Sequence, residues 1–349
     1  MVINKNNKLT DLQTLLERLK SNSSNNRFDA VIQLGKSSFQ ETNDILKQLI
    51  ISDPETIIRE LALITLTEKI KPEVLDIAKK IFYNPSEQPI MRARATWVFS
   101  QIQSKQAFDL AKEALNDRNE EVVYWALIGI ITFENASDAI PEIRKLAVKS
   151  RHSIIRQTAV WTIGMLGDIE SRELLEDRML IDTVPIVRLL STWALRKIDC
   201  LESIPNLSNA LSKDTNKLTR REIASTIGKI LDFEKQYESS QEQQSLFREM
   251  QDIAARVLIR ALLGDTSYVV RRTCAESLGK IRYKGILEKL IEALTTETNL
   301  FVRKEIVNTL GTISDPKALD ILKKAIRSHY KTIVEAAKEA IKKIKKSNE

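Results

Sequence analysis

Apolar and polar positions follow a helical period along this chain, and that helical pattern itself recurs about every 32 residues. In most units an apolar residue precedes an arginine, and we call the second position of this pair the arginine column. It is occupied by Arg27, Arg59, Arg92, Tyr124, Arg156, Arg188, Arg220, Arg271, Arg303 and Glu335. Successive members are 32, 33, 32, 32, 32, 32, 51, 32 and 32 residues apart. A period of this kind indicates a stacked array of repeats, which we number 1 to 10.

Further columns keep the same register. Three residues after the arginine column lie small or aliphatic residues, namely Ala30, Ala62, Ala95, Leu127, Ala159, Ser191, Ile223, Cys274 and Ile306. Positions −1, +3, +7 and +10 share one face of a helix. A second apolar-periodic segment separates consecutive columns, so each repeat is predicted to be a two-helix hairpin. Residues 1–349 are therefore expected to form a single domain, an all-α, right-handed α-solenoid of about ten hairpins.

A short polar or acidic residue precedes the arginine column by six positions in most repeats. These residues are Ser21, Asp53, Ser86, Ser150, Asp182, Asp214, Asp265 and Glu297. The turn between the two helices is expected here, where such a side chain can cap the second helix. It can also pair with a neighbouring arginine. The arginine column is therefore interpreted as a structural ladder, broken by Tyr124 in repeat 4 and by Glu335 in repeat 10.

The repeat resembles a known family. It is similar to the HEAT-like repeats of the phycobilisome-lyase type, whose pattern runs V-R-x-x-A-x-x-A-L-G-x-I-x-D-P-x-A, as seen in VVRRTCAESLGKI, IIRQTAVWTIGMLGDIESREL and FVRKEIVNTLGTISDPKAL. The resemblance covers nearly the whole chain and implies a HEAT-like superhelix. Scaffolds, bilin lyases and a few enzymes share this fold, so the resemblance implies no single function.

The one step of 51 residues carries an insertion near residues 233–252. Ser239 followed by Glu242 is typical of a capping box. Apolar residues then keep helical spacing, so the first helix of repeat 8 is predicted to begin early and to project beyond its neighbours. Phe247 lies near the expected exposed beginning of this helix. Two interpretations stay open, a plain extension or a contact arm in which Phe247 touches a partner.

All four tryptophans fall in repeats 3 to 6. Trp97, Trp161 and Trp193 lie five residues after the arginine column, and Trp125 lies one residue after it. These positions are expected away from the core, on the concave side of the array. Five further candidates for the same side are Tyr124, Arg94, Met165, Phe133 and Lys197. The indoles either wedge between neighbouring second helices or form a recognition surface, since tryptophan is enriched at the centres of interfaces.

Catalytic chemistry finds little support in the sequence. The two histidines, His152 and His329, have no ligand-spaced partners, and neither a phosphate-binding glycine loop nor a nucleophile elbow occurs. No catalytic, cofactor or metal site is therefore predicted. Cys200 and Cys274 form no close pair, which favours a reducing cytoplasm, and the longest apolar run is too short to cross a membrane.

The net charge of +7 is concentrated at one end, because residues 301–349 hold twelve basic and six acidic residues. Residues 320–349 are interpreted as a basic terminal cap. The favoured function is a non-enzymatic scaffold that binds a partner protein along the concave surface of repeats 3–6. The alternative implied by the resemblance is a bilin lyase or chaperone-like factor acting on a tetrapyrrole-carrying protein. A weaker alternative is a nucleic-acid adaptor that uses the basic end.

Overall fold

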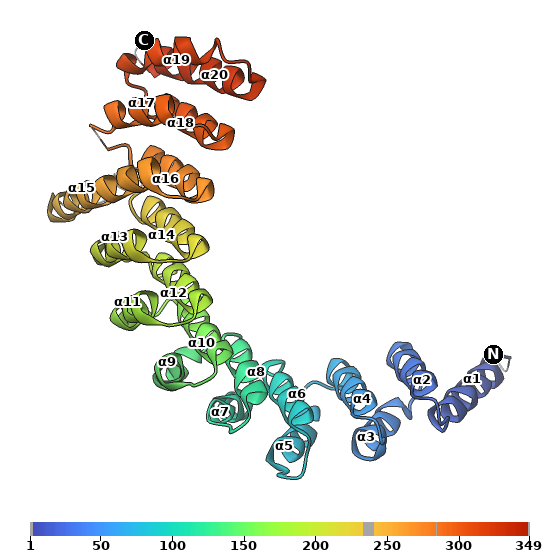
Figure 1. The fold of residues 1–349 in the computed structure, drawn as a ribbon. Helices are drawn as coiled ribbons and strands as arrows, with labels where there is room; N and C mark the ends of the chain where they lie inside the picture. The colour runs from blue at the N-terminus through green and yellow to red at the C-terminus, as the bar shows by residue number, and fades with distance from the viewer. Residues whose placement is uncertain (1–2, 233–240, 284, 348–349) are drawn as a thin grey trace. The chain divides into compact units, whose positions relative to one another are not determined.

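Twenty α-helices make up the part of the chain that the computed structural model describes, residues 3–232, 241–283 and 285–347 (Figure 1). The first helices of the repeats are α1 (Ile3–Leu19), α3 (Thr42–Ser52), α5 (Val74–Tyr83), α7 (Lys105–Ala114), α9 (Ile140–Lys149), α11 (Arg172–Ile181), α13 (Ile204–Lys213), α15 (Gln241–Gly264), α17 (Leu287–Thr296) and α19 (Leu319–Ala325). The second helices are α2 (Ser24–Lys36), α4 (Thr56–Lys69), α6 (Pro89–Ser100), α8 (Glu120–Ile130), α10 (Ser153–Leu166), α12 (Pro185–Lys197), α14 (Lys217–Ile230), α16 (Tyr268–Ile281), α18 (Leu300–Ile313) and α20 (Lys331–Ser347). The predicted α-solenoid of ten helical hairpins is confirmed.

Contacts divide the chain into two compact units, residues 1–143 and residues 144–349, which we call unit 1 and unit 2. Within each unit the second helices contact one another in sequence, as α2, α4, α6 and α8 do in unit 1. Figure 1 shows the first helices of each unit along one side and the second helices along the other. That residues 1–349 act as one array stays a prediction.

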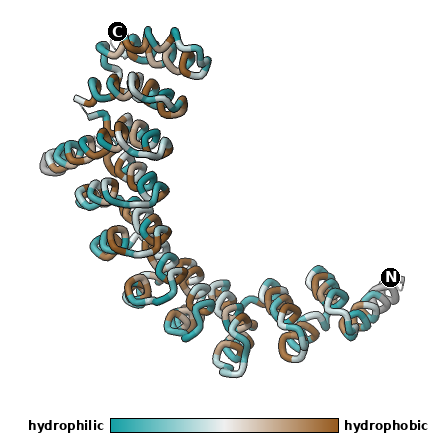
Figure 2. Tube along the Cα trace, viewed as in Figure 1, coloured by the Kyte–Doolittle hydropathy of each residue, from teal (hydrophilic) through white to brown (hydrophobic). Residues whose placement is uncertain are grey.

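The core lies where each hairpin packs on the next. In α12 the residue before Arg188 is Val187, and Ser191 and Leu195 follow Arg188 by three and seven positions. Each of the three is 0% exposed. Figure 2 shows hydrophobic residues along the facing sides of the helices and hydrophilic residues on their outer sides. The apolar columns therefore bury the hairpins against one another, as the helical spacing predicts.

Repeat 4 corrects the sequence alignment by one residue. Counted from Val123 instead of Tyr124, this repeat has Asp117 six residues earlier, where the other repeats carry their acid, and Asn119 at the N-cap of α8. Phe133 then falls at position +10, which in repeat 6 holds the buried Ile198. The expectation that Phe133 faces a partner is wrong, because it is 5% exposed and its ring packs edge-on against Phe108 at 5.5 Å.

Repeat 8 contains the longest first helix, as predicted. Its α15 spans 24 residues, whereas α13 and α17 span 10 each. The proposed capping box of Ser239 and Glu242 lies outside the residues whose side chains are described. Phe247 is 7% exposed and Met250 is 6% exposed, because α15 lays its apolar stripe against α13, α16 and α17. The interpretation of Phe247 as an exposed contact is therefore wrong.

Glycines allow second helices to approach closely. A Cβ on Gly164 of α10 would lie 2.8 Å from the Trp193 ring and 2.9 Å from the Ala194 Cα, both on α12. A Cβ on Gly228 of α14 would lie 2.8 Å from the Ser277 Cα of α16. Since these neighbours include backbone atoms, the helices could not keep their separation if a larger residue replaced either glycine. Across the described ranges, no helix combines the length and apolarity that a membrane crossing requires.

Candidate partner-binding surfaces

A ladder of ion pairs holds consecutive hairpins together. In unit 1 its pairs are Arg27–Asp53, Arg59–Glu87 and Arg92–Asp117, and in unit 2 they are Arg156–Asp182, Arg188–Asp214, Arg220–Asp265 and Arg271–Glu297. Each arginine lies on a second helix and reaches the turn of the next repeat. These seven arginines of the column are therefore structural, as predicted, and they are not available as a phosphate site.

One pair illustrates the geometry. The Arg188 Nε donates to Asp214 Oδ2 at 2.7 Å, and its Nη2 donates to Asp214 Oδ1 at 2.9 Å. A third guanidinium hydrogen bond, from Nη1 to the Asp182 carbonyl at 3.0 Å, ties the arginine to its own turn. The two side chains are only 12% and 4% exposed. Removal of one partner from such a nearly buried, bidentate pair leaves an unpaired charge, which costs far more than the loss of a surface ion pair.

The carboxylates of the ladder also fix the turns. Asp214 Oδ1 accepts the N–H of Asn216, the N-cap of α14, at 2.7 Å. Asp182 binds the Val184 N–H in the same way at 3.0 Å. The acid therefore stands two residues before the N-cap, which corrects the expectation that it caps the helix itself. The side chain of Asn216 does so, by accepting the N–H groups of Leu218 and Thr219.

Three carboxylates of the ladder, Asp182, Asp265 and Glu297, are kept charged by their arginines. Burial alone would raise the pKa of Asp182, but hydrogen bonds from Arg156 and from the Val184 N–H hold it below its ordinary value of 3.8. Burial likewise raises the pKa of Asp265, but the hydrogen bonds from Arg220 and from the Ser267 N–H lower it by more. The pKa of Glu297 is lowered in the same way by its hydrogen bonds with Arg271 and with the Asn299 N–H. Each pair is therefore ionised at neutral pH.

Two details depart from the predicted positions. In repeat 3 the neighbouring Glu87, not Ser86, receives Arg59. In repeat 10 the residue six positions before Glu335 is His329, so this turn offers no carboxylate to Arg303 of repeat 9. Among the described residues, the buried Nε of Arg303 lacks a hydrogen-bond partner.

In unit 1 the tryptophans surround an arginine. Arg94 of α6 lies over the Trp97 ring at 5.7 Å and over the Trp125 ring of α8 at 5.5 Å. It also donates to Glu60 of α4 at 3.1 Å. Tyr124 packs edge-on against Trp125, with ring centroids 5.7 Å apart. Both indoles are half-buried, and the Arg94 guanidinium lies over each of the two rings.

In unit 2 the tryptophans lie on the second helices α10 and α12. Trp161 and Trp193 are half-buried, and Trp193 rests against Gly164 of the preceding repeat. The Lys197 ammonium lies 5.4 Å from the centre of the Trp193 ring. Met165 follows Trp161 by one turn and is 45% exposed. The two interpretations of the indoles combine at Trp193, because its ring packs against the preceding second helix and remains partly open to solvent.

Sequence reasoning missed a column of exposed apolar residues two positions before the arginine column. Its members in repeats 5, 6 and 7 are Ile154, Ile186 and Leu218, which are 41%, 43% and 49% exposed. The residues 154, 161 and 165 share one face of α10, and 186 and 193 share the matching face of α12. We define the α10–α14 apolar surface as Ile154, Trp161, Met165, Ile186, Trp193 and Leu218. The signal was in the sequence, because this column is apolar in eight of the ten repeats.

Beyond α14 the column two positions before the arginine column stays apolar, and its member Phe301 is 62% exposed, whereas the positions further along the same faces become charged. Glu276 of α16 pairs with Lys280 at 2.8 Å, and Arg272 of α16 pairs with Glu305 of α18 at 3.4 Å. The tryptophan and methionine positions of the α10–α14 apolar surface are therefore taken by paired charges in α16, whereas the exposed Phe301, whose ring stacks on that of the exposed Tyr268, continues the apolar column. Nowhere in the described ranges do three His, Cys, Asp or Glu side chains gather as metal ligands would.

Comparison with known proteins agrees with this architecture. The family model for HEAT repeats matches residues 108–196 and 255–342, together just over half of the chain. An engineered protein of known structure shares 18% identity over 96% of this chain and 99% of its own, with a TM-score of 0.53. No curated protein matches the sequence.

The structures of a Kap95:Nup1 complex and of importin beta are also similar in fold. The structure of a Kap95:Nup1 complex aligns with a TM-score of 0.65 and 16% identity, over 95% of this chain and 50% of that one. Importin beta aligns with a TM-score of 0.61 and 12% identity, over 96% of this chain and 50% of that one. At such identities the likeness concerns the fold alone. On the family match and the ten hairpins together, the chain belongs to the HEAT-repeat proteins.

Proposed function

We propose that this chain is a non-enzymatic scaffold that binds a segment of a partner protein on the α10–α14 apolar surface of unit 2. The observation that carries the proposal is that the residues of this surface occupy matching positions on consecutive second helices. Its six residues come from three second helices that contact one another in sequence, and four of them are more than 40% exposed. Single exposed apolar side chains are ordinary, whereas a continuous row of them is typical of an interaction site.

The chemistry of the surface favours a protein segment with apolar or aromatic side chains. The two indoles supply large, rigid contact areas of the kind that dominate interface energetics. Lys197 beside Trp193 adds a cation at the edge of the surface. A peptide that places an apolar side chain between α10 and α12 and a carboxylate near Lys197 would match both features.

The proposed site is narrower than repeats 3–6, the span expected from the sequence. In unit 1 the Arg94 guanidinium already covers the faces of Trp97 and Trp125 and is held by Glu60. A partner that stacked on the same ring faces would have to displace Arg94 from Glu60, whereas the cation over Trp193 is the exposed Lys197. We therefore assign Arg94, Trp97, Trp125 and Tyr124 a structural role within unit 1.

The solved relatives lend general support. Structures of this fold are described as Kap121p bound to Nup53p and as Kap121p bound to Pho4p, so HEAT solenoids of similar shape do hold other proteins. Stacked repeats present extended surfaces for such contacts by their geometry.

A tetrapyrrole-handling role, which the phycobilisome-lyase resemblance implies, is the second candidate. One observation favours it, because a half-buried indole with an ammonium 5.4 Å from its ring centre could stack on a planar tetrapyrrole and bind a propionate. Purified protein mixed with phycocyanobilin would then show a shifted absorbance band. An unchanged spectrum would remove this candidate and leave the scaffold proposal standing.

Affinity capture from the native host tests the proposed surface. Wild-type protein is compared with the double variant Met165→Glu/Ile186→Glu, which places two carboxylates on the surface at exposed positions that the core does not need. The expected result is that partners captured by wild type are lost from the double variant.

The matched control is Ile51→Glu/Ile181→Glu, which changes two isoleucines that are 78% and 65% exposed at the ends of first helices. This control should capture the same partners as wild type. Equal capture by all three proteins would show that the partner binds elsewhere.

A further inference from the structure

The last repeat lacks the acid that closes the ladder in the repeats before it. Counted from the start of its second helix, repeat 10 needs the same shift of one residue as repeat 4. The Val334 N–H binds the Tyr330 carbonyl at 3.1 Å, as the Arg220 N–H binds the Asn216 carbonyl at 3.0 Å in repeat 7. Tyr330 therefore matches the N-cap residues of the other second helices. Ser328, two residues earlier, stands in the place of the ladder acid.

Ser328 forms one of the two contacts that a ladder acid forms. Its Oγ accepts the Tyr330 N–H at 3.2 Å, as Glu297 Oε1 accepts the Asn299 N–H at 2.8 Å in repeat 9. The other contact is the ion pair with an arginine of the preceding repeat. A serine hydroxyl carries no charge and cannot form it.

Arg303, the arginine that should receive this acid, has no partner. It lies on α18 at the position from which Arg271 of α16 reaches Glu297. Its Nε is buried and has no hydrogen-bond partner among the described residues. Folded proteins seldom leave a buried donor unsatisfied, so such a group calls for an explanation. At this position the chain keeps the arginine of the ladder and omits its acid.

Two other turns carry serine in the same place, and both differ from repeat 10. The His152 N–H binds Ser150 Oγ at 3.3 Å in repeat 5, and the Ser23 N–H binds Ser21 Oγ at 3.2 Å in repeat 1. Neither turn follows a ladder arginine, because repeat 4 has Val123 in the column and repeat 1 is the first hairpin described. Among the described hairpins, repeat 10 alone combines a serine turn with an arginine in the repeat before it.

A phosphate on Ser328 would supply the missing charge at the right distance. The phosphorus of a phosphoserine stands as far along the side chain from Cβ as the Cδ of a glutamate does. The ladder already accepts a side chain of that length, since Glu297 Oε2 and Oε1 lie 2.6 and 2.9 Å from the Arg271 Nε and Nη2. A phosphate has three strong acceptor oxygens, so it can bind an arginine and the N–H of the turn together.

We propose that Ser328 is a phosphorylation site, at which the phosphate closes the ladder onto Arg303. A protein kinase would transfer the γ-phosphoryl group of a nucleoside triphosphate to the Ser328 Oγ. The Oγ–P bond forms as the bond to the nucleoside diphosphate breaks, and the hydroxyl proton passes to the kinase. The modification would regulate how firmly repeat 10 is held, and it is independent of the α10–α14 apolar surface.

The turn before α20 is accessible to such an enzyme. Ser328 is half-buried, whereas its neighbours Arg327, His329 and Tyr330 are exposed. Repeat 10 is the last hairpin described, so among the described residues it packs against a neighbouring repeat on one side only. Terminal elements of this kind open locally more easily than central ones.

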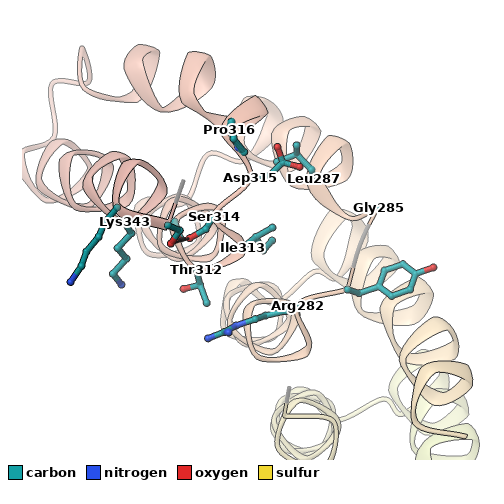
Figure 3. A pocket seen from close by; sticks show the side chains of 13 residues that line it. Arg282, Gly285, Leu287, Thr312, Ile313, Ser314, Asp315, Pro316 and Lys343 are labelled. Atoms are coloured by element: carbon teal, nitrogen blue, oxygen red, sulfur yellow. Dashed lines mark hydrogen bonds between the residues drawn. The ribbon is translucent and has the colours of Figure 1, made fainter. Parts of the chain in front are cut away.

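The far end of α20 adds little to the hold on repeat 10. There the interface with repeat 9 contains an open cavity of about 880 Å³, lined by Ile313 of α18 and Lys343 of α20 among others (Figure 3). Close packing is what stabilises a contact between helices, and it is incomplete at this end. Hydrogen bonds at the turn before α20 therefore matter more for holding the repeat.

Hydrogen exchange of the full chain tests whether the phosphate closes the ladder. Phosphoserine is introduced in place of Ser328 by genetic encoding, and amide exchange of α19 and α20 is followed by mass spectrometry. Exchange there should slow by about tenfold relative to the unmodified protein, because opening of repeat 10 would break charge-assisted hydrogen bonds. Ser328→Glu, which has the length of Glu297, should slow exchange as well.

Two comparisons separate the ladder from a general effect of charge. Phosphoserine in place of Ser150 puts the same group at the same kind of turn without a ladder arginine, so exchange of α9 and α10 should stay within about twofold of the unmodified protein. In Arg303→Met, phosphoserine in place of Ser328 should no longer slow exchange. An effect that persists in Arg303→Met, or equal effects at both serines, would overturn the proposal.

The modification itself is tested on protein purified from the native host, during growth and during starvation. Peptide mass spectrometry after cleavage at glutamate should find phosphate on Ser328, and Ser328→Ala should lose it. Absence of phosphate from Ser328 in both conditions would overturn the proposal. Phosphate confined to the neighbouring Tyr330 or Thr332 would overturn it too.

Discussion

Single residues decide how closely the second helices approach. Gly164 lets α10 contact Trp193 and Ala194 on the following helix, and Gly228 does the same between α14 and α16. The sequence indicates small residues at these positions, but it does not reveal what they touch. The exposure of Trp193 depends on a glycine 29 residues earlier, a contact that only the packed structure shows.

The variant Gly164→Ala should destabilise unit 2 by about 1–3 kcal/mol, because its Cβ would meet the Ala194 backbone and the Trp193 ring below contact distance. Urea denaturation followed by circular dichroism measures the loss. Gly264→Ala is the control, since nothing lies within 4 Å of a Cβ there. A Gly164→Ala protein as stable as the control would contradict the packing described at this crossing.

A ladder pair can be tested in the same way. Arg188→Ala and Asp214→Ala should each lower the free energy of unfolding by about 3 kcal/mol, because each leaves a nearly buried charge without its partner. The double variant should lose clearly less than the sum of the two losses, since neither charge remains. Strict additivity in this double-mutant cycle would show that the pair contributes no coupling.

The sequence predicts the helices more fully than it predicts the contacts between them. The 32-residue period predicts ten hairpins, the pairing of the arginine column and the early start of α15. The alignment of repeat 4 is one residue off, because Tyr124 occupies the place next to the apolar Val123 and no arginine marks the column. Asp117 and Phe133 carry the correct register, since they take the acid position and the +10 core position.

The burial of Phe247 on α15 can be tested by substitution. Phe247→Ala should lower stability by about 3 kcal/mol, as expected when a buried phenylalanine is truncated, and should leave partner capture unchanged. Arg248→Ala, at the exposed neighbouring position, should change neither property. Thermal unfolding and capture are measured on the same preparations. Loss of capture without loss of stability would restore the contact-arm interpretation of this helix.

The lowered pKa values of three ladder carboxylates predict how the stability of the protein depends on pH. Because the folded-state pKa values of Asp182, Asp265 and Glu297 lie below their ordinary values of 3.8 and 4.5, the pairs contribute fully above those values. Their contribution should be lost as pH falls below about 4.5 and through the lower folded-state pKa values. The urea midpoint should therefore stay level near neutrality and decline in acid, and Asp182→Asn should flatten part of the decline. A midpoint that rises between pH 5 and pH 3 would contradict this account.

For the whole molecule, the repeat pattern establishes the architecture, whereas the candidate surface depends on details beyond it. Four half-buried tryptophans in one stretch predict a common surface, yet the cation over both rings of unit 1 is Arg94, which Glu60 holds, whereas the cation over Trp193 in unit 2 is the exposed Lys197. No spacing rule separates these cases, because both depend on which side chain of a neighbouring helix reaches the ring. The exposed column at Ile154, Ile186 and Leu218 adds the apolar area that the tryptophans alone do not supply.

Site-specific photo-cross-linking in the native host tests the proposed surface most directly. A photoreactive amino acid replaces Met165 on α10 or, as the control, Glu173 on α11, whose side chain is 85% exposed. The account predicts a discrete protein adduct from position 165 that disappears when Ile186→Glu is added, and no such adduct from position 173. The same adduct from both positions, or an adduct from position 165 that survives Ile186→Glu, would contradict it.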